Sequence, residues 1–117
     1  MAVYDLAHKL ADHLQKSEEY QDYSRLREQV MQDEKTRKMI REYQSLSFKA
    51  NTAQSMGQET GEKDRERLEQ LEELINMNTA ARKFLQAEAR LGVMLQDVQK
   101  IIMQDLELGL EEIDGEE

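Results

Sequence analysis

The chain has 117 residues, of which 38% are hydrophobic, 35% are charged and 5% are aromatic, and it contains neither proline nor cysteine. Its 25 acidic and 16 basic residues give a net charge of −9. The lack of cysteine excludes disulfides, thiolate metal sites, cysteine-ligated iron–sulfur clusters and cysteine nucleophiles. The negative charge disfavours direct nucleic-acid binding.

The composition predicts an all-α protein, because a proline-free chain rich in Leu, Ala, Glu, Gln, Lys and Arg favours helix nearly throughout. We expect an elongated antiparallel array of about four to five helices with a long C-terminal helix. A single domain should cover residues 1–110, followed by an acidic, disordered tail at 111–117. The sequence shows no signal-peptide pattern and no apolar run of about 20 residues, so a cytoplasmic protein without membrane insertion is expected.

The first half of the chain predicts three helices. Ser17, followed by two glutamates, has the pattern of an N-cap that begins a second helix, and Asp33 is expected to cap a third. In the third helix Phe48 lies opposite the apolar face, which indicates a second packing surface. The first helix, over residues 3–15, carries a narrow apolar stripe formed by Val3, Leu6, Leu10 and Leu14.

Two features divide the second half of the chain. Gly57 to Gly61 is a loop signal that precedes a fourth, highly charged helix. Asn78 is expected to cap a fifth helix, because the apolar stripe before it and the stripe after it would face opposite sides of one straight helix.

The last helix, predicted over residues 79–108, carries two apolar stripes. A chain of this size has few elements with which to cover both, so the second stripe indicates self-association; alternatively, the first two helices cover it. The first stripe contains Phe84, Leu91, Leu95, Val98, Ile102 and Leu106, and the second contains Ala87, Met94, Ile101 and Leu108, spaced seven residues apart.

No pattern in the sequence indicates an enzyme, a cofactor site or a metal site. The two histidines, His8 and His13, are five residues apart and therefore point in different directions from one helix, so they cannot share a metal ion. Phosphate-binding loops, nucleophile elbows and metalloprotease motifs are absent from the sequence. A small basic cluster, formed by Lys35, Arg37, Lys38 and Arg41, is either a solvated helix face or a docking site.

Several segments together resemble the YlbF/YmcA family, and most closely its YheA-like branch from Gram-positive bacteria. The resemblance covers about residues 3–108 and rests on helical patterns. The segments that carry it are Val3-Tyr4-Asp5-Leu6-Ala7-His8, Ser17-Glu18-Glu19-Tyr20, Asn78 through Ala87-Glu88-Ala89-Arg90-Leu91, and Asp97-Val98-Gln99-Lys100-Ile101-Ile102.

The resemblance implies a small all-helical oligomer without enzymatic activity. Better-understood branches act as regulatory adaptors in competence, sporulation and biofilm development, within a complex that bears on RNA processing by a membrane-anchored endoribonuclease. Those branches carry cysteines associated with an iron–sulfur cluster. This sequence departs from them, because it has no cysteine to ligate one.

The leading functional hypothesis is therefore a non-enzymatic adaptor that forms a homodimer or higher homo-oligomer and binds an unidentified protein partner. A holdase-like helical scaffold that shields unfolded proteins is the alternative. The residues expected at the oligomer or partner interface are Phe48, Ala87, Met94, Ile101 and Leu108.

Overall fold

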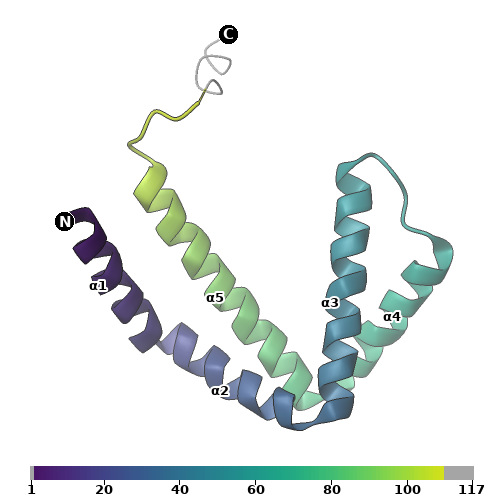
Figure 1. Ribbon diagram of the computed structural model, residues 1–117. Helices are drawn as coiled ribbons and strands as arrows, with labels where there is room; N and C mark the ends of the chain where they lie inside the picture. Colours follow the sequence, from purple (N-terminus) through teal and green to yellow (C-terminus); the bar gives the residue numbers. More distant parts are fainter. Residues whose placement is uncertain (1, 110–117) are drawn as a thin grey trace.

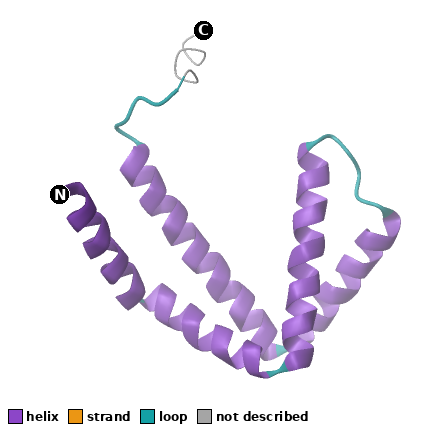
Figure 2. Ribbon diagram, in the orientation of Figure 1, coloured by secondary structure: helices purple, strands orange, loops and turns teal. Residues whose placement is uncertain are grey.

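The computed structural model describes residues 2–109, and all regular structure in this part of the chain is helical (Figures 1 and 2). The predicted all-α class, with about five helices, is confirmed. The helices are α1 (Ala2–Lys16), α2 (Glu18–Gln32), α3 (Glu34–Ser55), α4 (Glu62–Met77) and α5 (Thr79–Met103). Within residues 2–109, no helix combines the length and the apolar character that crossing a bilayer requires.

Local capping explains two of the helix boundaries. The Ser17 hydroxyl accepts a hydrogen bond from the Tyr20 backbone N–H at 3.2 Å and begins α2. The Asn78 side-chain oxygen accepts one from the Ala81 N–H at 3.0 Å and begins α5. Each side chain satisfies a backbone donor that the first helical turn leaves without a partner. Both predicted breaks are confirmed.

Asp33 separates α2 from α3 as expected, but its carboxylate does not make the predicted cap. Its Oδ2 instead accepts a hydrogen bond from the Thr36 hydroxyl at 2.6 Å. That hydrogen bond lowers the pKa of the Asp33 carboxyl below its ordinary value of 3.8. Thr36 is 3% exposed and accepts a hydrogen bond from the Asn78 side-chain amide at 3.0 Å. The α2–α3 corner and the α4–α5 corner are thereby joined.

The last helix is shorter than predicted: α5 ends at Met103 instead of residue 108. Its 25 residues span about 37 Å. Residues 101–109 are all exposed, so no tertiary contact supports a further turn, and a helix without such support ends early. Leu106 and Leu108 therefore lie beyond the helix. The predicted tail, 111–117, lies outside the described residues, as does residue 110.

The helices form two arms that meet at one end and diverge from it (Figure 1). One arm consists of α2 packed along the first half of α5, with α1 continuing from α2 towards the N-terminus. The other arm is the α3–α4 hairpin. A bidentate pair, in which Arg67 donates to both Glu42 carboxylate oxygens at 2.7 Å, ties α4 to α3.

The core lies where the two arms meet. The Tyr23 and Phe84 rings pack there with centroids 5.6 Å apart. The radius of gyration is 18.6 Å, against about 13 Å for a compact chain of this length. Much of the helical surface is therefore not covered within one chain. The buried residues of the core are Leu26, Val30, Ile40, Ile75, Ala81, Phe84 and Ala87.

Candidate protein-interaction surface

Both apolar stripes of α5 are buried at the start of the helix and exposed at its end. In the first stripe, exposure rises from 6% at Phe84 to 45% at Leu95 and 57% at Ile102. In the second stripe it rises from 1% at Ala87 to 63% at Ile101. Coverage of the two stripes therefore decreases along the helix, because α2 packs against the start and middle of α5, where Glu19 lines one hollow with Val93, Met94 and Asp97.

Helix α1 does not cover the second half of α5. Its main contact is with α2, and Figure 1 shows a gap between it and the second half of α5. Its own apolar stripe is open at the N-terminal end, where Val3 is 73% exposed and Leu6 is 64% exposed. The sequence left two alternatives for the second stripe: self-association, or coverage by the first two helices. Of these two helices, only α2 covers the stripe, and it does so only over the start and middle of α5.

Large apolar side chains gather at the end of this arm. We define them as the distal surface, which has one part on α1 and another on α5. A hollow of about 420 Å³, lined by Arg90, Val93, Met94 and Asp97 among others, adjoins it on α5. The distal surface consists of Val3, Tyr4, Leu6, Val93, Leu95, Ile101, Ile102 and Met103, each more than 40% exposed.

The accessible area gives an independent measure of the uncovered surface. The chain exposes 9820 Å², whereas a compact monomer of its mass, 13.7 kDa, exposes about 6,600 Å². The excess of about 3,200 Å² is well above the roughly 800 Å² that each partner contributes to a standard protein–protein interface. The excess is consistent with the open arrangement of the helices, which also gives the large radius of gyration.

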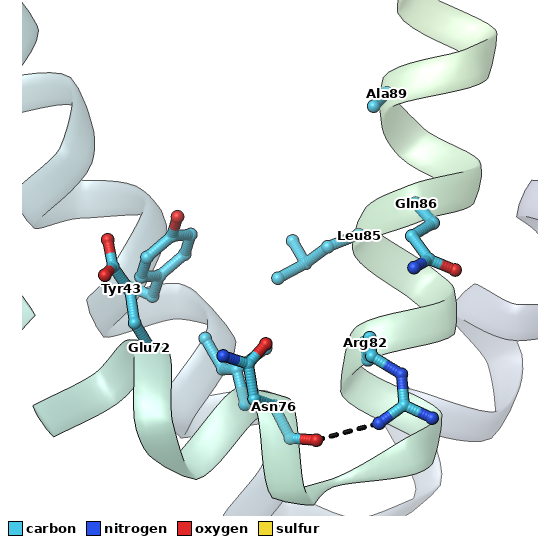
Figure 3. A pocket seen from close by; sticks show the side chains of 8 residues that line it. Tyr43, Glu72, Asn76, Arg82, Leu85, Gln86 and Ala89 are labelled. Atoms are coloured by element: carbon cyan, nitrogen blue, oxygen red, sulfur yellow. Dashed lines mark hydrogen bonds between the residues drawn. The ribbon is translucent and has the colours of Figure 1, made fainter. Parts of the chain in front are cut away.

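A second concave region lies between the two arms (Figure 3). It encloses about 430 Å³, and its apolar wall includes Tyr43 on α3 and Leu85 on α5. At its base the Arg82 guanidinium donates a hydrogen bond to the Asn76 backbone oxygen at 2.8 Å. This cleft contains no histidine, serine or cysteine, and its acidic side chain, Glu72, is exposed. Its lining is mainly apolar, with polar groups of Glu72, Asn76, Arg82 and Gln86 around it.

The groups that could ligate a metal ion are scattered. Within residues 2–109, no three or more His, Cys, Asp or Glu side chains are placed to hold one ion together. His8 and His13 are both exposed on α1.

The structure places the five predicted interface residues in different environments. Phe48 is 74% exposed on α3, Ile101 is 63% exposed on the distal surface, and Met94 is half-buried beside the hollow. Leu108 is 53% exposed but lies beyond the end of α5. Ala87 requires a correction: it is buried in the core of its own chain, where α2 packs on α5, so it is not free to contact a partner.

Sequence reasoning did not assign α1 or Val93 to the exposed surface. The narrow apolar stripe of α1 could have indicated this exposure, because the chain had few remaining elements to cover it. Val93 follows Gly92 and belongs to neither predicted stripe, so periodicity gave no indication of its exposure of 57%.

The five helices and the exposed apolar side chains at their ends define a class of small all-α proteins with an open fold. The sequence profile of the family described as "Control of competence regulator ComK, YlbF/YmcA" matches residues 3–107. The chain therefore belongs to the YlbF/YmcA family, as the resemblance predicted. Its assignment to the YheA-like branch stays a prediction.

Individual relatives extend over nearly the whole chain. A UPF0342 protein of Halothermothrix orenii is 38% identical over 112 residues, covering 96% of this chain and 95% of its own. A UPF0342 protein of Desulfitobacterium hafniense is 37% identical, covering 97% and 95%. A solved structure, titled "Protein of Unknown Function (DUF964) from Bacillus stearothermophilus", is similar in fold, with a TM-score of 0.72, 21% identity, and coverage of 89% of this chain and 91% of its own.

Proposed function

We propose that this protein is a non-enzymatic, homo-oligomeric regulatory protein of the cytoplasm that works by binding other proteins. The observation that carries the proposal is the exposure of both α5 stripes over the second half of the helix, with Ile101 at 63% and Ile102 at 57%. Burial of such side chains is the main favourable term in protein association.

We propose that the distal surface binds a second copy of the chain. In a two-fold dimer the same surface is used twice, so each apolar side chain of α1 and α5 is covered by its counterpart arm. Met94 lies where the covered part of α5 passes into the open part, and Ile101 lies within the open part. Phe48 belongs to the other arm and is proposed as a separate contact for a protein partner. Leu108 is proposed as a peripheral contact.

The regulatory part of the proposal is supported by the family. Its description refers to control of a competence regulator, a role that proteins perform through other proteins. We propose that this chain acts as an adaptor in bacterial developmental regulation, with a link to RNA processing.

The test is affinity purification from the native cell after mild crosslinking, with mass spectrometry of the recovered proteins. Ile101→Glu removes an apolar contact of the distal surface, and Met77→Glu is the matched control at a still more exposed position, 84% against 63%, at the end of α4. We expect a specific, stoichiometric partner with the wild type and with Met77→Glu, and its loss with Ile101→Glu. Recovery of a broad set of unfolded proteins would instead support the holdase-like scaffold.

A further inference from the structure

Three arginines line a small cavity, open to solvent, that lies apart from the distal surface; Arg27 and Arg41 are exposed, and Arg37 is half-buried. Arg27 comes from α2, and Arg37 and Arg41 come from α3. The cavity holds about 190 Å³, and its walls include Val30, Ile40 and Phe84 of the core. The basic cluster of the sequence is therefore divided: Lys38 pairs with Glu34 at 3.0 Å on the helix surface, whereas Arg37 and Arg41 line the cavity.

None of the three arginines is paired with a carboxylate in the described part of the chain. Other arginines of this acidic protein are paired: Arg67 binds Glu42 at 2.7 Å, and Arg25 lies 3.7 Å from Asp22. In contrast, the Nε of Arg37 is buried and has no hydrogen-bond partner among residues 2–109, so an anion in the cavity would contact the terminal nitrogens of this guanidinium. A buried donor without an acceptor is unfavourable and is rare in native proteins.

The one carboxylate in the cavity offsets only one of the three arginine charges. Glu88 on α5 also lines it, but both its oxygens accept hydrogen bonds from the Gln44 amide, at 2.9 and 3.1 Å. The three guanidinium groups and one carboxylate give the lining a net charge of about +2, because arginine remains protonated in proteins. A dianion would balance this charge.

We propose that this cavity binds a phosphate dianion, in the form of inorganic phosphate or a phosphate monoester. Guanidinium groups match phosphate oxygens in geometry as well as in charge. The volume, about 190 Å³, is large enough for a phosphate group. A monoester carries close to two charges at neutral pH. A nucleic-acid phosphodiester carries one, so the charge match favours the monoester.

Binding at this site would join the two arms. The cavity lies between α2 and α5 of one arm and α3 of the other. An anion held by Arg27 on one side and by Arg37 or Arg41 on the other would crosslink α2 to α3. We therefore expect phosphate to raise the melting temperature of the protein as well as to bind.

The experiment is isothermal titration calorimetry of the full chain with two probes at fixed ionic strength, set with sodium chloride. The probes are inorganic phosphate and phosphoserine blocked at both ends. We expect Arg37→Met to weaken binding at least tenfold and to remove the phosphate-dependent rise in melting temperature. Arg41→Gln changes an exposed side chain, so it leaves the fold intact, and it should also weaken binding at least threefold. Arg65→Met, at an exposed position on α4, is the control and should bind as the wild type does.

The two probes distinguish the sources of the phosphate group. Equal affinity would assign the site to a free phosphate compound, whereas at least tenfold tighter binding of blocked phosphoserine would assign it to a phosphorylated side chain of a partner. Absence of binding for both probes would overturn the proposal. Equal weakening by Arg37→Met and Arg65→Met would also overturn it, since that result indicates nonspecific charge attraction.

Discussion

Replacing Ile101 with Glu tests whether the distal surface joins two copies of the chain. Complete burial of an isoleucine side chain contributes about 1.5–3 kcal/mol, so covering the 63% of Ile101 that is exposed contributes about 1–2 kcal/mol. A two-fold dimer contains this contact twice, which gives about 2–4 kcal/mol for the pair. The dissociation constant should therefore rise by about 30-fold to several hundredfold, and burial of the new carboxylate raises it further.

The assay is light scattering coupled to size exclusion over a hundredfold range of protein concentration. The wild type and the Met77→Glu control should show the same concentration-dependent mass, above the monomer mass of 13.7 kDa. Ile101→Glu should remain monomeric to much higher concentration. Its helical content by circular dichroism should be unchanged, because the replaced side chain packs little within its own chain. A wild type that is monomeric throughout, or an Ile101→Glu variant with unchanged mass, would refute the reasoning.

Three further predictions concern the fold. Leu71→Ala should lower the free energy of unfolding by about 2–5 kcal/mol in urea denaturation because Leu71 is 0% exposed, whereas Leu74→Ala, at 48% exposure, should lower it by less than about 1.5 kcal/mol. Asn78→Ala removes the α5 cap and a hydrogen bond to α3, and should lower the same free energy by about 1–3 kcal/mol; an unchanged urea midpoint would contradict this account. Arg67 hydrogen bonding holds the pKa of the Glu42 carboxyl below its ordinary value of 4.5. The stability from this pair is therefore fully present above about pH 4.5 and is lost as pH falls through the lower folded pKa, so Arg67→Met should lessen the acid-induced loss of stability between pH 5 and pH 3.

The sequence by itself determined the helical class and the main divisions between helices. The predicted caps at Ser17 and Asn78 and the loop after Gly57 are confirmed. These features could be read from the sequence because each depends on neighbouring residues: a capping side chain reaches a backbone donor three positions ahead, and a glycine adopts a positive φ, here 74° at Gly57.

Tertiary structure alone decided which parts of the apolar stripes are covered. Ala87 and Ile101 belong to the same predicted stripe, yet one is 1% exposed and the other 63%. Periodicity shows that one side of a helix is apolar, but coverage depends on how far a neighbouring helix extends along it: α2 begins at Glu18, and α1, which precedes it, lies apart from the end of α5. The same reason applies to the arginine cavity. Arg27 lies on a different helix from Arg37, and only the packing of α2 against α3 and α5 brings them to one cavity.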